Sequence, residues 1–280
     1  MRLIIPNVII LSIILYYASP LAASNVNTNI YPGSIYITEI TRNEYNQDIY
    51  HEEDRLLKWS KNDEYYLVYG ISYKSKIGNN KLLLKDRNSK VLKTININIT
   101  DKDFKIQKIN VNKKYIKPSV DDMERIKRDS IQLNQARKIW IDSNPDLDFI
   151  WPVDGITTGV FGTKRFYNGI EGNYHNGYDI AADIGTPIIA PSSGKIILTG
   201  DFFYNGKTIC LDHGRGLKSI MIHLDEILVQ ENDYVKKGQV IGKVGSTGKS
   251  TGPHLHWSVL INNTYIDPEL LVNSMLIKNL

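Results

Sequence analysis

Short runs of β-branched and aromatic residues, separated by turn-forming residues, recur along most of the chain and constrain its fold more than any other feature. Between Ile30 and Lys117 they include "GSIYITEI", "EYYLVYGISY", "NKLLLKD" and "VLKTININI". After Trp151 they return as "GKIILTG", "KTICLDH", "SIMIHL" and "HLHWSVLI", and Asn205-Gly206 is a strong hairpin signal between two such runs. We therefore predict a mainly β protein with two β-rich regions.

A different pattern lies between the two regions. Residues 119–144 contain neither Gly nor Pro, and Pro145 follows them directly. Ser119 suits a helix N-cap, and the acidic residues after it would lie in the first turn, where negative charge favours the helix dipole. We expect one helix over residues 119–144, linking a small N-terminal β-domain (residues 27–118) to a C-terminal β-domain (residues 150–275).

The first residues have the order of features found in export signals. A positive charge at Arg2 precedes the apolar run "VIILSIILYYA" and the small residues "SPLAAS". We expect residues 1–24 to be a signal peptide of an exported, periplasmic protein, with an uncleaved membrane anchor as the alternative because the run is short for a spanning helix. Export permits disulfides, but Cys210 is the single cysteine and lies in a strand-like run, so we expect a buried thiol.

Charge and motif spacing argue against two classes of partner. The chain has 34 Lys+Arg and 30 Asp+Glu without a block of like charge, so we expect no nucleic acid. The stretch "GSTGKST" is similar to a phosphate-binding loop, but five residues instead of four separate Gly242 from Gly248. Pro253 and strand-like residues follow where that motif requires a helix, so we expect no nucleotide.

Most of the histidines lie in the second β-rich region. His254 and His256 are two residues apart in a strand-like run, so both side chains point to one face of the sheet. His175 precedes Asp179 by four residues in "YHNGYDIA", where Gly177 disfavours a regular helix and a loop leading into a strand can turn both side chains inward. Two imidazoles and one carboxylate, with an open fourth position, are the composition of a catalytic zinc site.

Two further histidines stand in other runs of this region. His223, in "MIHLD", lies on another strand-like run. His213, in "DHGRG", is followed by glycines, so we predict a turn outside the site.

Several ordered motifs together resemble one protein family. "HNGYD", "MIHLD" and "GSTGKSTGPHLHW", with "FGTKR" and "VKKGQVIGKVG", resemble the M23 metallopeptidases, the lysostaphin-like or LytM-type peptidoglycan endopeptidases, over about residues 150–271. The upstream β-domain and helix are similar to the N-terminal region of Gram-negative members. The resemblance implies a C-terminal antiparallel β-sheet peptidase domain of the LytM/lysostaphin type.

The resemblance also implies a set of functional residues. It implies one zinc ion (Zn²⁺) per chain, held by His175, Asp179 and His256, and catalytic roles for His223 and His254. The family usually has a tyrosine two residues before the second of these histidines, where this chain has Met221.

The implied function is a zinc-dependent endopeptidase that hydrolyses the peptide cross-links of peptidoglycan in cell-wall remodelling. In a Gram-negative wall the implied bond joins D-alanine to diaminopimelate. The alternative is a non-catalytic wall-binding protein or amidase activator on the same scaffold. Proteins of that kind typically lack the metal ligands, so the full set of ligands and histidines favours the enzyme.

Overall fold

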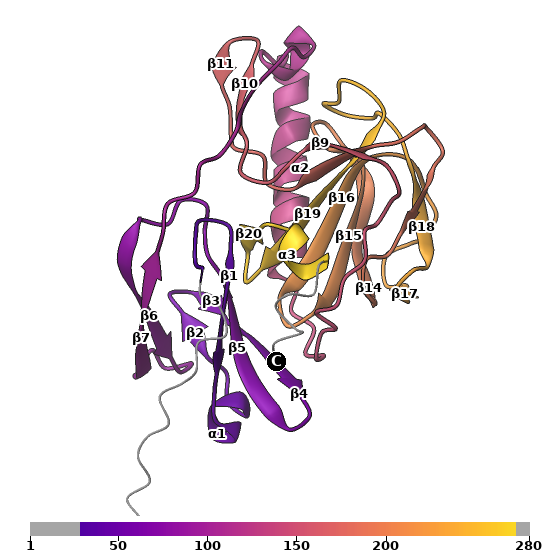
Figure 1. Cartoon of the computed structure of the whole chain (residues 1–280). Helices are drawn as coiled ribbons and strands as arrows, with labels where there is room; N and C mark the ends of the chain where they lie inside the picture. The colour runs from indigo at the N-terminus through magenta and orange to yellow at the C-terminus, as the bar shows by residue number, and fades with distance from the viewer. Residues whose placement is uncertain (1–28, 273–280) are drawn as a thin grey trace, which may run out of the picture.

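The computed structural model describes residues 29–272, and this part of the chain is mainly β, as predicted (Figure 1). The expected signal peptide, residues 1–24, lies outside the described residues, as do residues 273–275 at the end of the expected C-terminal domain. Among the described residues, no helix combines the length and the apolar character that crossing a membrane requires.

The N-terminal half forms two small antiparallel sheets, drawn in indigo and purple in Figure 1. One has the strand order β1-β5-β4 and the other the order β3-β2-β6-β7. Their elements are β1 (Ile35–Glu39), α1 (Arg42–Tyr45), β2 (Tyr50–His51), β3 (Asp54–Arg55), β4 (Leu57–Lys61), β5 (Glu64–Gly70), β6 (Gly78–Lys85) and β7 (Val91–Ile99).

The β1-β5-β4 sheet is buried on both faces, which explains why β1 and β5 are almost continuously apolar. On one face, Ile35 and Ile37 belong to the same hydrophobic cluster as Trp257 of the C-terminal half. On the other face, Tyr36 packs in a second cluster with Leu82 of β6. The two halves of the chain therefore share one hydrophobic core.

The predicted linking helix is present, but it ends earlier than expected. Helix α2 (Val120–Lys138) begins after the N-cap Ser119, which forms a capping box. The expected range 119–144 is wrong at its end, because the residue after the helix has an extended backbone. The Ile141 carbonyl then accepts a hydrogen bond from Arg215 N at 2.7 Å. A tertiary contact thus uses a backbone group that a longer helix would have needed.

The C-terminal half is built on a ten-stranded sheet with the main order β17-β14-β15-β16-β19-β12-β9. Strand β18 joins it through β16 and also pairs with β13, while β20 pairs with β19. The elements are β9 (Ile156–Gly159), β12 (Tyr178–Ala181), β13 (Pro187–Ile189), β14 (Gly194–Phe202), β15 (Gly206–Gly214), β16 (Leu217–Ile227), β17 (Tyr234–Val235), β18 (Val240–Val244), β19 (His254–Ile261), β20 (Thr264–Ile266) and α3 (Glu269–Val272).

The two faces of this sheet have different neighbours. One face carries the shared core, and α2 covers part of the other, where Leu133 packs on a cluster that contains Cys210 and Leu260. Cys210 is buried, and burial raises the pKa of its thiol to about 12, as expected for a structural cysteine. The predicted hairpin at Asn205-Gly206 joins β14 to β15, and Gly206 has φ +64°, a backbone conformation that favours glycine.

A third sheet joins the two halves of the chain. Its strands have the order β11-β10-β8, with bounds β8 (Ile106–Ile109), β10 (Lys164–Tyr167) and β11 (Ile170–Glu171). Strand β8, followed by the 3-10 turn Lys113–Tyr115, pairs in parallel with β10. Gln107 lies opposite Arg165 and Ile109 opposite Tyr167, so these four side chains share one face. The N-terminal half thus adds a strand to the C-terminal half.

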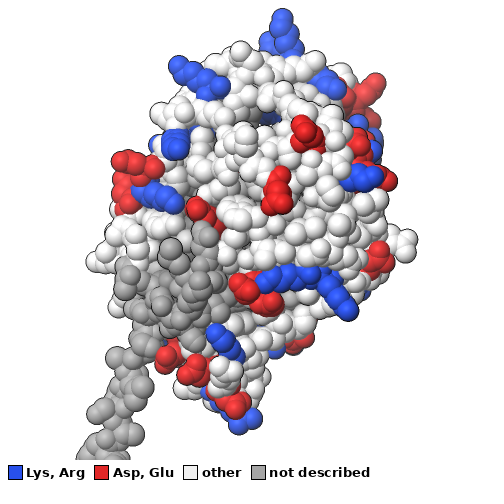
Figure 2. All heavy atoms as spheres, turned by 45° about the vertical axis from the view of Figure 1, so that its right-hand side comes forward, with Lys and Arg blue, Asp and Glu red and all other residues white. Residues whose placement is uncertain are grey.

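Basic and acidic side chains are interspersed on the described surface that Figure 2 shows, and neither sign covers a broad continuous area of that face.

We predict that the shared core makes the two halves unfold together. Trp59 of β4 is 5% exposed and belongs to the shared core, and its Nε1 donates to the Pro145 carbonyl at 3.1 Å. Replacing a buried tryptophan by alanine typically costs about 3–5 kcal/mol. Trp59→Ala should therefore lower the free energy of unfolding by about that amount while leaving one cooperative transition in urea.

Tyr234→Ala is the matched control for this measurement, because Tyr234 is an aromatic residue that is 71% exposed. Its change in unfolding free energy should stay within about 0.5 kcal/mol. Two separate transitions in the unaltered chain, or an equally small effect of Trp59→Ala, would show that the halves are independent.

Candidate metal centre

Three side chains from two adjacent strands and one loop converge at one point. The distances are 3.0 Å between His175 Nε2 and Asp179 Oδ1, 2.9 Å between His175 Nε2 and His256 Nδ1, and 2.7 Å between His256 Nδ1 and Asp179 Oδ1. All three residues are buried. Within the described part of the chain they form a group able to hold a metal ion.

The pairing of two strands brings these residues together. Asp179 of β12 lies directly opposite His256 of β19 in the antiparallel ladder. His175 reaches them from the loop before β12, whose backbone runs close to β19 at Gly177. A Cβ atom at Gly177 would lie 2.3 Å from the Trp257 carbonyl oxygen, so only glycine fits there. Gly177 thus allows His175 and Asp179 to face the same point.

Hydrogen bonds on the far side of each imidazole fix which nitrogen faces the centre with a lone pair. His175 Nδ1 lies 2.8 Å from the Val160 carbonyl oxygen, which can only accept, so Nδ1 carries the proton. His256 Nε2 lies 2.8 Å from Ser258 Oγ, and the Ser258 hydroxyl itself donates toward Asn176 Oδ1. In both neutral rings the nitrogen that faces the centre is therefore an acceptor.

The donor set fits a divalent cation such as Zn²⁺. Two imidazole lone pairs and a carboxylate oxygen face one another at 2.7–3.0 Å without a donor between them. A tetrahedral zinc site with bonds of about 2.0–2.1 Å places its ligand atoms about 3.3 Å apart, so small outward shifts of the side chains admit the ion. Buried acceptors without a donor are costly, and a cation removes that cost.

The charge of Asp179 has further partners. Burial by itself raises the pKa of this carboxyl. In the metal-free protein, a proton on the facing nitrogen of His175 or His256 would donate a hydrogen bond to the carboxylate and attract its charge, and these interactions hold the pKa of Asp179 well below its ordinary value. The second carboxylate oxygen, Oδ2, forms an ion pair with Arg165, and Gln107 Oε1 of β8 accepts from Arg165 Nε at 3.1 Å. Arg165 and Gln107 thus orient the ligand, and sequence reasoning assigned no role to either.

Two more histidines border the centre, and in each of them a backbone carbonyl holds Nδ1. His254 Nδ1 donates to the Gly252 carbonyl at 2.8 Å, and His223 Nδ1 donates to the Thr247 carbonyl at 2.8 Å. In the neutral rings the Nε2 atoms are consequently acceptors. His254 Nε2 lies 3.8 Å from Asp179 Oδ1. The centroids of the His223 and His254 rings are 4.8 Å apart.

A β-bulge turns His223 into the cleft. Met221 pairs with Ile209 and Leu224 pairs with Lys207, so two residues of β16 oppose one residue of β15. His223 has φ +68°, a left-handed conformation that is uncommon for a non-glycine residue. Met221 and Leu224 both lie in the shared core although they are three residues apart. In a regular strand His223 would have pointed into the core beside Met221.

The structure corrects one prediction and explains one departure from the family pattern. His213 does not lie in a turn: it is a buried residue of β15, with Nδ1 2.9 Å from the Ser193 carbonyl and Nε2 2.9 Å from Ser219 Oγ. The turn follows at residues 214–216, which all have positive φ. Met221 is fully buried in the core, so its side chain does not line the cleft.

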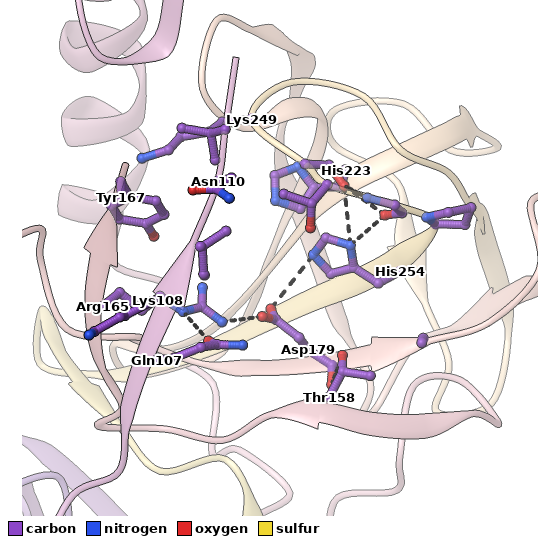
Figure 3. A pocket seen from close by; sticks show the side chains of 17 residues that line it. Gln107, Lys108, Asn110, Thr158, Arg165, Tyr167, Asp179, His223, Lys249 and His254 are labelled. Atoms are coloured by element: carbon purple, nitrogen blue, oxygen red, sulfur yellow. Dashed lines mark hydrogen bonds and ion pairs between the residues drawn. The ribbon is translucent and has the colours of Figure 1, made fainter. Parts of the chain in front are cut away.

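The centre opens into a cleft that consists of two cavities of about 480 and 470 Å³. The first is lined by Asp179 and His254, and the second by His175 and His256. Residues 107–111 of the N-terminal half line the first cavity, as Figure 3 shows for Gln107, Lys108 and Asn110. Sequence reasoning did not identify residues 107–111 as a wall of the cleft, because nothing in the local sequence pattern indicates which strand β8 pairs with.

Comparisons with known proteins agree with this geometry. Residues 173–268 match the family model of Peptidase family M23. Peptidoglycan DD-endopeptidase ShyB of Vibrio cholerae is 42% identical over 123 residues, which are 42% of this chain and 28% of that protein. Lysostaphin of Staphylococcus simulans is 45% identical over 105 residues, which are 37% of this chain and 21% of that protein. The chain thus covers less than a third of the length of these relatives.

One solved structure is similar over both halves. A crystal structure from Pseudomonas aeruginosa that is assigned to peptidase M23 has a TM-score of 0.70 and 29% sequence identity, covering 88% of this chain and 96% of that one. The similarity therefore extends beyond the matched domain to the N-terminal sheets and helix α2.

We predict that buried neutral histidines make the metal-free protein less stable in mild acid. Burial, followed by smaller charge effects, lowers the pKa of His213 to about 4 and of His223 to about 3. As the pH falls below about 6.5, the pKa of histidine in the unfolded chain, the unfolded chain takes up protons before the folded one does. The free energy of unfolding should therefore fall between about pH 6.5 and pH 4, by up to about 1.4 kcal/mol per pH unit for each histidine.

Urea unfolding of chelator-treated protein at pH 7.5, 6 and 5 measures this effect. The carboxyl of Asp179 stays ionised in the folded state over this range, because its pKa lies well below the ordinary value. A free energy of unfolding that does not change between pH 7.5 and 5 would contradict the prediction.

Proposed function

Because residues 173–268 form a domain of peptidase family M23, we propose that the chain is a zinc-dependent endopeptidase that hydrolyses peptide cross-links of bacterial peptidoglycan. The observation that carries the proposal is the convergence of His175, Asp179 and His256, with two further histidines whose acceptor nitrogens border the same cleft. A non-catalytic wall-binding protein would not need these five side chains in this arrangement.

The ligands in this proposal are His175 Nε2, His256 Nδ1 and Asp179 Oδ1. A zinc ion bound there would polarise the scissile carbonyl and lower the pKa of a bound water to about 7. The protein's own part is to present three ligand atoms and to leave the cleft side open. Arg165 holds the second carboxylate oxygen of Asp179, which restricts rotation of that ligand.

His223 and His254 are proposed to move the protons of the reaction. Each ring is held by a backbone carbonyl at Nδ1, so each neutral Nε2 can take a proton from the attacking water and return it to the leaving amine. Burial lowers the pKa of His223 to about 3, so its ring is neutral at neutral pH and its Nε2 has a free lone pair toward the cleft. A protonated His254 would be a donor to the developing oxyanion.

The substrate bond in this proposal is the amide between D-alanine and diaminopimelate, and the place of action is outside the cytoplasm, in the periplasm. ShyB, which is named a peptidoglycan DD-endopeptidase, supports the bond type. We further propose residues 150–275 as the catalytic domain and residues 27–118 as an accessory domain. Residues 107–111 of the accessory domain line the catalytic cleft.

The test of this proposal is incubation of the purified chain with sacculi that contain diaminopimelate cross-links. We expect cross-linked dimers to disappear and monomers with a free diaminopimelate amino group to accumulate, measured by chromatography and mass spectrometry. A chelator should abolish the reaction, and zinc should restore it. Intact cross-links after incubation of the zinc-loaded chain would refute the proposal.

A second prediction separates the ligands from the proton-transfer residues. Alanine at His175, Asp179 or His256 should remove zinc and activity together, because each substitution deletes a ligand atom. His223→Ala and His254→Ala should retain zinc but lower the rate by about 10²–10⁴-fold, as expected for loss of a general acid–base group.

The zinc content of each variant, together with its rate of cleavage of the cross-linked peptidoglycan dimer, tests whether each residue is a ligand or a proton-transfer residue. His51→Ala is the control histidine substitution, because His51 lies in β2 of the N-terminal half. Zinc lost in His254→Ala but retained in His256→Ala would mean that ligand and proton-transfer residue have been exchanged.

A further inference from the structure

Lys249 is a cation at the cleft that forms no ion pair with any of the residues that the structure describes. It belongs to the "GSTGKST" loop, whose Thr247 carbonyl holds the His223 ring, but the catalytic proposal gives the Lys249 side chain no role. Its Nζ lies 3.3 Å from the centroid of the Tyr167 ring and 6.0 Å from that of Tyr204, and the residue is half-buried. Among residues 29–272, no carboxylate lies within ion-pair distance of this Nζ, so the ammonium group is held by aromatic faces alone.

The surroundings of Lys249 leave a positive charge uncompensated. Lys108, Arg165 and Lys249 line the first cavity, where Asp179 is the one acidic residue among the lining residues, and no acidic residue lines the second cavity. The carboxylate of Asp179 already forms an ion pair with Arg165, and its other oxygen faces the metal centre. Burial, followed by the nearby charge of Arg165, lowers the pKa of Lys249 to about 8. An anion is the ligand that these surroundings favour.

Lys249 also lies where a bound peptide must pass. Four residues line both cavities of the cleft: Arg165, Tyr167, His223 and Lys249. The metal-centre residues border the same two cavities, Asp179 in the first and His175 and His256 in the second. In Figure 3, Lys249 and Tyr167 lie on the opposite side of the pocket from His223 and His254, and the Lys249 side chain extends toward Tyr167. A peptide whose amide reaches the metal centre therefore has Lys249 beside it.

We propose that Lys249 binds a carboxylate that the substrate carries next to the scissile amide. The inference rests on the proposed function and names a recognition element within it. In a cross-link to diaminopimelate, the carbon that bears the amide nitrogen also bears a carboxylate. A bridge made of glycine, or a cross-link to the side chain of lysine, has no carboxylate at that position.

The contact with Tyr167 makes this recognition feasible. A cation–π contact at a partly exposed site is weaker than a charge-assisted hydrogen bond to a carboxylate, so the ammonium group can leave the ring for the substrate. Tyr167 lies on β10 beside Ile109 of β8, so the ring that holds Lys249 is positioned partly by the N-terminal half. Lys249 is thus a specificity-determining residue, and Tyr167 is a positioning residue.

The experiment compares two dimeric muropeptides in the full chain. One has the free diaminopimelate carboxylate next to the cross-link, and the other has that carboxylate converted to the amide. We expect the unaltered protein to prefer the free acid in kcat/KM by about 10-fold to 100-fold, as expected for one charge-assisted hydrogen bond. Lys249→Met should abolish the preference by raising KM for the free acid alone, and Lys249→Arg should retain most of it.

Lys243→Met is the matched control, because Lys243 pairs with Glu226 at 2.6 Å and does not line either cavity. This variant should keep the preference of the unaltered protein. Calorimetric binding of both dimers to the metal-free chain gives a second readout that needs no catalysis. Lys249→Met should weaken binding of the free acid and leave binding of the amide unchanged.

The outcomes separate this inference from the proposed function. Equal losses on both dimers, or a preference that Lys249→Met does not change, would overturn the role of Lys249 while leaving the endopeptidase proposal intact. If neither dimer is cleaved but the metal-free chain prefers the free acid through Lys249, the carboxylate site stands and the proposed reaction fails. Equal binding and equal cleavage of both dimers by the unaltered protein would also overturn the inference.

Discussion

Three hydrogen-bond acceptors that face one another are the constraint on which the rest of this structure depends. Nε2 of His175, Oδ1 of Asp179 and Nδ1 of His256 lie within 3.0 Å of one another in a buried position. The Val160 carbonyl and the Ser258 hydroxyl keep the ring protons on the far sides. Such a group is costly unless a cation lies between its members, which is why a metal centre explains the arrangement.

The rigidity of the centre comes from the opposite face of the same sheet. Along β19 the side chains that face the site alternate with Leu255, Trp257 and Val259, which are fully buried in the shared core. Displacing a ligand would therefore require displacing a close-packed core residue. Because the N-terminal sheet contributes Ile35 and Ile37 to this core, both halves of the chain hold the centre in place.

The N-terminal half also contributes to the cleft directly. Gln107 binds Arg165, which binds Asp179, so one short chain of polar contacts runs from β8 to the candidate metal centre. Ile109 lies beside Tyr167, whose ring holds Lys249. Both halves therefore form the cleft, and one of its walls comes from a segment outside the residues that match the M23 family model.

Local patterns in the sequence were sufficient for the mainly β fold, for the start of α2 at Ser119 and for the common face of His254 and His256. Each of these depends on residues a few positions apart, through strand alternation or helix capping. Tertiary structure decided the rest. The helix ends at Lys138 instead of residue 144, the bulge at His223 reverses the strand alternation, and β8 joins β10 across more than fifty residues of chain. Likewise, the local sequence around Lys249 does not indicate that its ammonium group packs on aromatic rings instead of pairing with an acidic residue of the described chain, because Tyr167 and Tyr204 come from distant segments.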